Sequence, residues 1–329
     1  MMSRRRQYES EPTERLSTLV SSCASDCKKE IPVREIEEVL RDPNVDPNIP
    51  FFNLSDLDIP QGFIRQKDER IRARGRDSFL EILAILEIFG RRPDFDANKI
   101  YRNNGMALIH LILYRHRPGD RYTQPLLSAI LKLHNIDVNL RSASPPSFTA
   151  LQMAIYYGSV NMARILLVEG HADSTMMQWP NTDQSIIQYV VGPRYAVYKN
   201  IKLEMTRLLL EEGGGCDVNV IHPDSGDTLL HICQDPDVCE LLIEKGCDFT
   251  VLNNAGRNAM QHAYFHNRGL AQEAIKDAII HAENMCSATQ HLFRSRLGPD
   301  VAHMIASRTY PPLFTPRYVQ EAMDLPLED

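Results

Sequence analysis

The sequence predicts an all-α solenoid of stacked helix-turn-helix units, and two alternating ladders of residues predict it. The first ladder marks the fourth residue of a turn-helix element, with successive spacings of 42, 36, 43 and 30 residues. Its members are His110, Gln152, Gln188, His231 and Gln261. The second ladder is an aspartate after an apolar second helix, found at Asp46, Asp96, Asp137, Asp173, Asp217 and Asp248. Because one pair of short helices cannot bury both of its apolar stripes alone, such units must stack on one another.

Composition is typical of a folded intracellular chain. Of 329 residues, 43% are hydrophobic and 24% are charged, and the formal net charge of -7 disfavours nucleic acid and anionic membrane as partners. The longest apolar candidate, Phe79 to Phe89, is interrupted by Glu81 and Glu87, so no membrane insertion is expected. The N-terminus lacks an apolar signal core, and the seven cysteines do not form a disulfide framework. We therefore expect a cytoplasmic or nuclear location, or both.

The stretch Ser147 to Asp173 is the most regular unit. Thr149 is placed to cap a first helix, Gly158 permits the turn between the helices, and Gly170 is expected to act as the C-cap of the second helix. The first apolar stripe consists of Leu151, Ala154 and Ile155, and the second of Val160, Ala163, Leu166 and Leu167. The helical spacing of both stripes indicates two amphipathic helices.

These units resemble the ankyrin-repeat family. The pattern of that family is a glycine-containing turn, Thr-Pro-Leu-His-x-Ala, a glycine, a Leu-Leu second helix and a Gly-Ala-Asp-Val-Asn close. The segments that carry the resemblance are Gly226–His231, Leu241–Asp248, Leu166–Gly170 and Leu209–Gly213. The motif proline is replaced in the five well-marked units, by Leu108, Ala150, Ile186, Leu229 and Ala259. The resemblance implies an ankyrin-repeat solenoid with short β-turn or hairpin loops, irregular repeats and a helical C-terminal extension.

Three regions are expected along the chain. Residues 1–29 form an N-terminal tail and capping helix, residues 30–284 an array of about six to seven units, and residues 285–329 a helical, proline-rich extension. Pro12 to Cys27 and Val33 to Leu40 are predicted to form a helix pair. Phe51 to Gly75 lacks a clean first helix, so it is either an irregular insertion or a remodelled first half of the next unit.

Several units depart from the regular length. The units Arg102 to Asn139 and Asn181 to Asn219 are stretched, and Gly192-Pro193 is expected to end a first helix in the second of them. The unit that begins near His231 is short, so its first helix must be clipped, with Asp235-Pro236 as the turn and Asp237 as the next cap.

One basic run stands out in the array, formed by Arg65, Lys67, Arg70, Arg72, Arg74 and Arg76. It either docks an acidic partner or phosphate, or forms a solvated helix face or loop. We favour the solvated face, because runs of like charge are usually surface features. Nucleic-acid binding has little support, since no aromatic side chains alternate with the charges.

The sequence does not predict an enzyme. No nucleophile elbow, phosphate-binding loop or metalloprotease motif is present, and Cys233, Cys239 and Cys247 lack the paired spacing of a zinc site. His231 is better explained as a turn residue that hydrogen-bonds backbone, and Cys233 as a small buried hydrophobe. No cofactor and no metal are therefore expected.

Recognition of another protein or peptide is the remaining function. In the ankyrin family partners usually meet the concave face, made by turn tips and by the outward residues of the first helices. Carried over position by position, this implies a site at Met106, Tyr114, Arg115, Phe148, Tyr156, Tyr157, Asp227, Arg257, Phe265 and His266, with Gln184 as a further turn tip. Exposed aromatic residues with arginine nearby are typical of binding hot spots.

The leading hypothesis is a non-enzymatic, monomeric scaffold that binds a protein through this face. The alternative is an adaptor, such as a ubiquitin-ligase substrate receptor or a host-targeting effector. In an adaptor the repeats would select a client, and the extension that contains Tyr310 to Tyr318 would recruit a second partner. An enzyme with a site in the insertions between repeats is the distant third.

Overall fold

A computed structural model of the chain describes residues 11–48, 58–100, 105–114, 120–175, 184–195, 199–212, 215–266, 273 and 275–277. The chain divides into two compact units, Met1–Ala172 and Asp173–Asp329. Within the described ranges the structure is helical, and Arg141 and Thr149 form an isolated antiparallel β-bridge. The predicted extension from residue 285 onward lies outside the described residues, and its helices and Pro-rich stretch stay predictions.

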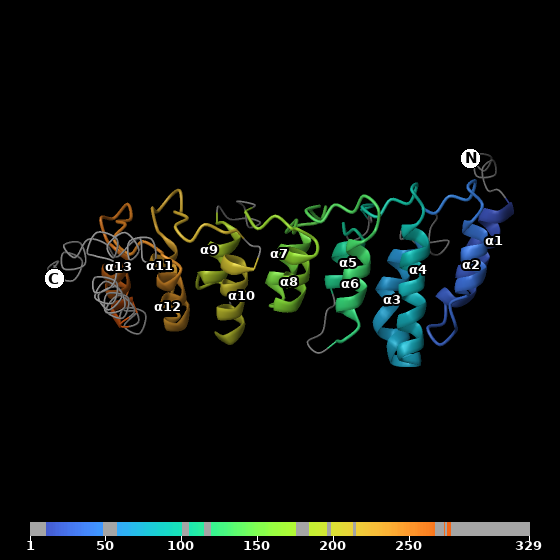
Figure 1. Ribbon diagram of the computed structural model, residues 1–329, viewed down its shortest axis with the longest axis horizontal. Coiled ribbons are helices and arrows are strands. Elements are labelled where there is room, and N and C mark those ends of the chain that lie inside the picture. The colour runs from blue at the N-terminus through green and yellow to red at the C-terminus, as the bar shows by residue number, and fades with distance from the viewer. Residues whose placement is uncertain are drawn as a thin grey trace, which may run out of the picture. The chain divides into compact units, whose positions relative to one another are not determined.

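The described residues of the first unit form four helix pairs. Their bounds are α1 Glu11–Ala24, α2 Val33–Leu40, α3 Ile59–Arg74, α4 Arg76–Gly90, α5 Leu108–Tyr114, α6 Thr123–Leu131, α7 Ala150–Tyr156 and α8 Val160–Val168. The first helices of successive pairs (α1, α3, α5, α7) pack side by side, and so do the second helices (α2, α4, α6, α8), as Figure 1 shows. The result is a two-layered stack with its apolar core between the layers, which confirms the predicted all-α ankyrin-type solenoid for this unit.

The ladder residue of a repeat makes hydrogen bonds that cap the start of that repeat's first helix. Thr149 Oγ1 accepts the N–H of Gln152 at 3.2 Å, and Gln152 Oε1 accepts the N–H of Thr149 at 3.0 Å, which forms a capping box. In α5 the Nδ1 atom of His110 accepts the N–H of Ala107 at 3.2 Å. The Nε2 atom of His110 lies 3.0 Å from the carbonyl oxygen of Leu140, in the loop before the next unit. The ladder residue therefore ties together its own helix cap and, through His110, the neighbouring repeat.

The structure adds a ladder residue, Gln61, that the sequence alignment missed. Helix α3 begins with a capping box between Asp58 and Gln61, has Pro60 in its first turn, and sends Gln61 Nε2 to the carbonyl oxygen of Lys99 at 2.8 Å. His110 makes the equivalent contacts in the next repeat. Of the two alternatives for Phe51 to Gly75, the described part is thus a remodelled first half of a repeat. In this repeat Ile59 occupies the position of the motif proline, and Pro60 follows it by one residue.

Asparagines join the loop tips of neighbouring units. Asn48 Nδ2 donates to the carbonyl oxygen of Asp94 at 2.8 Å, and Asn48 Oδ1 accepts the N–H of Asp96 at 2.8 Å. Asn98 makes the same pair of bonds to Asn135 and Asp137, at 2.6 and 2.8 Å. The aspartate ladder thus marks positions where one repeat is hydrogen-bonded to the next repeat.

The expected C-cap role of Gly170 is wrong. Helix α8 ends with Glu169 as its C-cap, and the left-handed residue is His171, at φ 51°. A Cβ atom at Gly170 would lie 2.8 Å from the carbonyl oxygen of Leu166 and 3.0 Å from Leu131 Cδ2. A glycine is therefore needed here because its own helix and the Leu131 side chain of the preceding repeat approach too closely for a Cβ atom, and not because of its backbone freedom.

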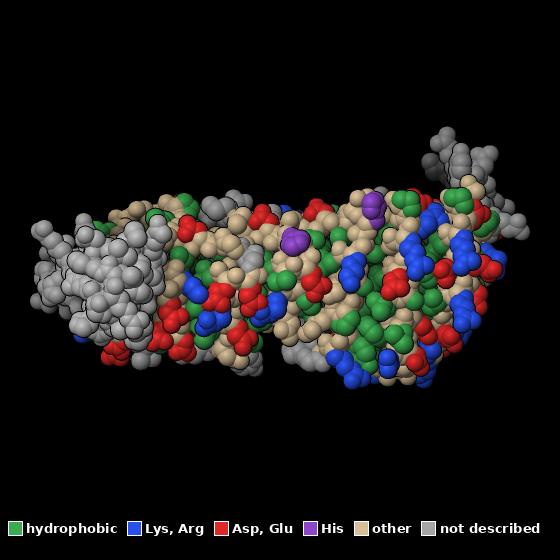
Figure 2. Space-filling model, viewed as in Figure 1, with side chains coloured by type: hydrophobic (Ala, Val, Ile, Leu, Met, Phe, Trp, Pro, Cys, Tyr) green, Lys and Arg blue, Asp and Glu red, His purple; other side chains and the backbone are tan. Residues whose placement is uncertain are grey.

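The basic run on α3 is only partly a solvated face, which corrects the favoured interpretation. Arg70 is fully buried, donates to the carbonyl oxygens of Cys23 at 2.6 Å and Lys29 at 3.2 Å, and stacks 4.9 Å over the ring of Phe63. The Arg70 side chain thus clamps the end of α1 onto α3. Lys67 is buried as well. The exposed members of the run are Arg65, Arg72 and Arg76. On the face drawn in Figure 2, basic, acidic and apolar side chains mix over α1 to α4.

The second unit repeats the helix-pair pattern with shorter first helices. Its elements are α9 Ile186–Val191, α10 Lys199–Glu211, α11 Leu229–Ile232, α12 Pro236–Glu244 and α13 Ala259–Phe265. Gly192 ends α9 as expected, and α11 is clipped to four residues. The cap of α12 is Asp235, whose side chain accepts the N–H of Asp237 at 3.1 Å, so the expected cap at Asp237 is wrong by two residues.

Candidate functional site

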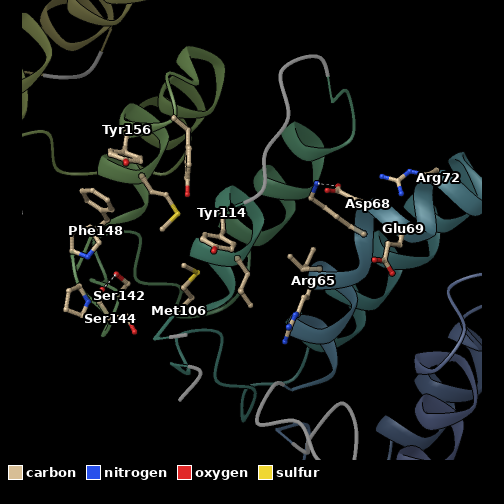
Figure 3. A pocket seen from close by; sticks show the side chains of 17 residues that line it. Arg65, Asp68, Glu69, Arg72, Met106, Tyr114, Ser142, Ser144, Phe148 and Tyr156 are labelled. Carbon is tan, nitrogen blue, oxygen red and sulfur yellow. Dashed lines mark hydrogen bonds and ion pairs between the residues drawn. The ribbon is translucent and has the colours of Figure 1, made fainter. Parts of the chain in front are cut away.

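A groove with a volume of about 1030 Å³ opens in the first unit, along one side of the first helices α3, α5 and α7 (Figure 3). Its lining falls into two groups. One side comes from α3 and consists of Ile64, Arg65, Lys67, Asp68, Glu69 and Arg72. The other side comes from α5, α7 and the loops before them and consists of Met106, Leu111, Tyr114, Ser142, Ser144, Pro145, Pro146, Phe148, Met153, Tyr156 and Tyr157. Five of the ten predicted site residues therefore meet in one groove.

Three side chains of the groove occupy the same position of three successive repeats. Arg65, Tyr114 and Tyr156 each follow the ladder residue of their helix by four positions. Because α3, α5 and α7 pack side by side, this position recurs along one side of the stack. In Figure 3 Tyr114 lies between Tyr156 on α7 and the charged side chains of α3. The repeat itself thus places an arginine and two tyrosines in a row.

The tyrosines form an aromatic wall that is half exposed. The ring of Tyr156 lies 5.4 Å from that of Tyr157, at an angle of 79° between the ring planes. The exposed fractions are 44% for Tyr114, 51% for Tyr156 and 43% for Tyr157. Partial burial, with Tyr114 and Tyr156 nearby, raises the pKa of the Tyr157 hydroxyl above its ordinary value. The Tyr157 hydroxyl is therefore a neutral hydrogen-bonding group at physiological pH.

Phe148 supports this wall from below and is not an exposed turn tip. Its exposed fraction is 7%, and its ring lies 5.3 Å from that of Tyr156. The backbone around it is fixed, because the Phe148 carbonyl oxygen accepts the N–H of Ser142 at 2.9 Å. Arg141 and Thr149 form the bridge that closes this loop. Phe148 thus holds Tyr156 in place without presenting much surface of its own.

The charged side of the groove exists because α3 is long. Helix α3 has 16 residues, whereas α5 and α7 have 7 each. Its extra turns carry Asp68, Glu69 and Arg72 past the ends of its neighbours. In Figure 3 the side chains of Arg65, Asp68 and Arg72 lie on the far side of the groove from Tyr156, with Tyr114 between them. The groove therefore has one aromatic side and one charged side.

Lys67 is the buried centre of the charged side. Its Nζ atom lies 2.7 Å from Asp68 Oδ1 and 3.0 Å from Asp120 Oδ2, and its side chain is 3% exposed. Burial by itself raises the pKa of Asp120, but the Thr123 hydroxyl, the Tyr122 N–H and Lys67 together lower it below the ordinary value. The Lys67 charge is thus compensated within the protein, and the ion pair joins α3 to the loop before α6.

None of the other predicted residues whose side chains the structure describes lines this groove. Arg115 and the side chain of Phe265 fall outside the described residues. Asp227 accepts a hydrogen bond from Asn253 Nδ2 at 2.8 Å, and the carbonyl oxygen of Arg257 lies 2.9 Å from His231 Nε2. The exposed His266 ring lies 4.3 Å from that of His262. Asp227, Arg257 and His266, like the turn tip Gln184, belong to the second unit, whereas the groove is lined by the first unit alone.

Sequence reasoning missed Arg65 and Arg72 as groove residues, together with the buried floor residues Leu111 and Met153. A signal for Arg65 exists, because Gln61 is a ladder residue and Arg65 follows it by four. Leu111 and Met153 each follow a ladder residue by one position. The offset of four that located Tyr114 and Tyr156 would have found Arg65 once Gln61 was recognised.

The thiols of the second unit are packed in its core. Cys233, Cys239 and Cys247 are all buried, and burial raises the pKa of Cys247 to about 12. A hydrogen bond with Cys233, together with burial, raises the pKa of Cys239. The Cys239 and Cys247 thiols are therefore protonated at neutral pH, and all three buried cysteines pack as small core side chains. Across the described part of the chain, no cluster of three or more His, Cys, Asp or Glu residues is arranged to bind a metal ion.

No helix among the described residues combines the length and the apolar character needed to cross a lipid bilayer.

Comparisons with known proteins match the fold and not the sequence. No protein-family model matches this sequence, and no curated protein matches it. Two solved structures are similar in backbone. EF0377, an ankyrin repeat protein, has a TM-score of 0.43 and 13% identity and covers 79% of this chain and 97% of its own. The ankyrin repeat domain of Bcl-3, described as a unique member of the IkappaB protein family, has a TM-score of 0.48 and 15% identity and covers 67% of this chain and 85% of its own.

Neither TM-score reaches 0.5, so the repeat assignment rests on the chain's own capping pattern. That pattern is consistent across both units. Capping boxes begin α3, α7, α9 and α11, each with Gln or His as the ladder residue. The chain is thus built of ankyrin-type repeats, several of them irregular.

Proposed function

We propose that this chain is a non-enzymatic scaffold that binds another protein, and that the groove of the first unit is the binding site. The observation that carries the proposal is the row formed by Arg65, Tyr114 and Tyr156 at one repeated position beside a groove of about 1030 Å³. Monomeric proteins seldom leave several large aromatic side chains half exposed next to each other without a use for them.

The physical properties of the wall suit protein recognition. Tyrosine offers a large contact area, a hydroxyl group and few rotatable bonds, so its side chain loses little conformational entropy when a partner binds. The Tyr156 ring is already held against Phe148, 5.3 Å away, so little of its freedom is left to be lost on binding. Residues with this makeup are the ones that contribute most to measured binding energies.

Selection of displayed random peptides on the intact chain tests this proposal. We expect enriched peptides that bind the wild-type chain and lose binding to the double variant Tyr156→Ala with Tyr157→Ala. Val168→Ala is the matched control, because Val168 is 51% exposed on α8 and does not line the groove. Peptides that bind the double variant as well as the wild type would place the binding site elsewhere and overturn the proposal.

The adaptor alternative depends on residues 310–329, which lie outside the described residues. It is separable from the scaffold proposal by deletion of that segment. A chain that lacks Tyr310 to Asp329 should keep peptide binding in the groove under either hypothesis. An adaptor would in addition lose a second partner that the full chain retains.

A further inference from the structure

The charges on the two sides of the groove indicate what kind of segment would fill it. We propose that its occupant is an extended, proline-containing acidic segment, with carboxylates three residues apart that pair with Arg65 and Arg72 and with prolines that pack on the tyrosines. This inference rests on the proposed binding function and adds the chemistry of the partner.

The first step is the charge that α3 leaves uncompensated. Lys67 is neutralised by Asp68 and Asp120, at 2.7 and 3.0 Å. Arg65 and Arg72 are exposed, line the groove and make no ion pair with any described residue.

Of the acidic residues on the same side, Asp68 pairs with Lys67. Glu69 is exposed, and its Oε2 atom accepts a hydrogen bond from the Cys27 thiol at 3.5 Å, on the side of α1. The cationic groups available to a partner are therefore the two guanidinium groups of Arg65 and Arg72. Guanidinium binds carboxylate in a bidentate geometry that a neutral amide does not reproduce.

The second step is the spacing of the two arginines. They are seven residues apart on one helix, which places them on the same face and about 10 Å apart along the axis. A polyproline II segment rises about 3.1 Å per residue with three residues per turn. Carboxylates three residues apart on such a segment therefore lie on one edge, about 9 Å apart, and match the two guanidinium groups.

The third step is the aromatic side. Tyr114, Tyr156 and Tyr157 offer half-exposed rings in a fixed arrangement, with Tyr156 and Tyr157 edge to face at 5.4 Å. Aromatic-lined grooves of this kind bind polyproline II segments, because proline rings pack on the aromatic faces and the ligand is stiff before it binds. With acidic residues facing α3, prolines at the following positions lie on another edge of the same helix. These prolines meet the tyrosines.

Fluorescence-anisotropy titration with defined peptides tests this inference on the intact chain. The probe is a labelled peptide of repeated Glu-Pro-Ala, and the comparison peptides carry Gln or Lys in place of each Glu. We expect the Glu peptide to bind the wild type about tenfold more tightly than the Gln peptide. The double variant Arg65→Glu with Arg72→Glu should reverse the preference and bind the Lys peptide best. Arg76→Glu is the matched control, because Arg76 is exposed but does not line the groove, and it should behave as the wild type.

Three outcomes would overturn the inference: equal binding of the Glu and Gln peptides, no effect of the double charge reversal, or tighter binding of an alanine-based helical peptide with glutamates seven residues apart. None of them touches the proposed function, which the selection of random peptides decides separately. If displayed peptides require Tyr156 and Tyr157 but carry no acidic-proline pattern, the groove binds protein and only the chemistry assigned to its partner is wrong.

Discussion

The ring of Phe148 packs against that of Tyr156, with centroids 5.3 Å apart and the ring planes tilted by 38°. The two residues differ sharply in exposure, at 7% for Phe148 and 51% for Tyr156. One ring is thus part of the core and the other part of the surface, although they touch. Their substitution by alanine should therefore have different consequences.

We expect Phe148→Ala to lower the free energy of unfolding by about 3 kcal/mol, because it leaves a cavity under the aromatic wall. The double variant Tyr156→Ala with Tyr157→Ala should lower it by less than about 1 kcal/mol. Urea unfolding followed by circular dichroism compares the variants. A large loss of stability in the tyrosine variant would show that both rings are core residues and contradict their assignment to the binding surface.

His110 should make the first unit sensitive to acid. Burial lowers the pKa of His110 to about 4, whereas an unfolded histidine titrates near 6.5. Between these values the unfolded chain binds a proton that the folded chain does not, so the free energy of unfolding falls as the pH falls from about 6.5 to 4. The loss attributable to His110 is on the order of 2 kcal/mol.

The chain itself supplies the control for His110. Gln61 and Gln152 fill the same repeat position and make the same cap hydrogen bond without a titratable group. His110→Gln should therefore match the wild type at pH 7.5 and exceed its stability at pH 5. Equal pH dependence of the two chains would show that His110 is not the buried neutral group that the structure indicates.

Asp58 should have the opposite effect on the pH dependence of the free energy of unfolding. Burial raises the pKa of this helix-capping carboxyl group to about 7, and its Oδ2 atom has no hydrogen-bond partner in the described structure. Between about pH 4 and 7 the folded chain keeps a proton that the unfolded chain releases, so the stability contributed by Asp58 falls as the pH rises through this window.

Asp58→Ser keeps a capping oxygen, as Ser185 does at the start of α9, and removes the buried charge. At pH 8 the variant should be more stable than the wild type by about 4 kcal/mol, and the difference should vanish near pH 4. Thermal unfolding at the two pH values measures both quantities. A variant that is less stable than the wild type at pH 8 would contradict the buried-charge explanation.

The Lys67–Asp120 ion pair should hold the long helix α3 to the loop before α6. A double-mutant cycle with Lys67→Met and Asp120→Asn should give a coupling energy of about 1–3 kcal/mol, because Lys67 is buried. The exposed pair Arg207–Glu211, with atoms 3.4 Å apart, is the control and should give about 0.5 kcal/mol or less. Equal coupling in the two pairs would show that burial does not strengthen the Lys67 contact.

Local rules predicted much of the fold. The Thr149 cap, the turn at Gly158, the end of α9 at Gly192 and the clipped α11 all follow from cap and turn residues whose effect is confined to a few neighbours. The five groove residues found in advance follow from the repeat, because stacking places equivalent positions side by side. Periodicity therefore carried the prediction from single helices to the site.

The misses have a physical cause in common. The burial of Arg70 depends on the carbonyl oxygens of Cys23 and Lys29, more than 40 residues away in sequence, and no local pattern encodes that contact. The length of α3 likewise follows from its packing on α1 and α4. Only the missed ladder residue Gln61 was within reach, since Asp58 and Gln61 have the capping-box spacing of Thr149 and Gln152.

The affinity of one selected peptide for three chains tests the central claim most directly. The chains are the wild type, the double variant Tyr156→Ala with Tyr157→Ala, and Val168→Ala, each with its thermal unfolding measured beside it. The account predicts a Kd raised by about 30-fold or more in the tyrosine variant alone, with all three melting curves nearly superimposed. An unchanged Kd in the tyrosine variant, or a loss of affinity that follows its loss of stability, would contradict the assignment of the binding site to this groove.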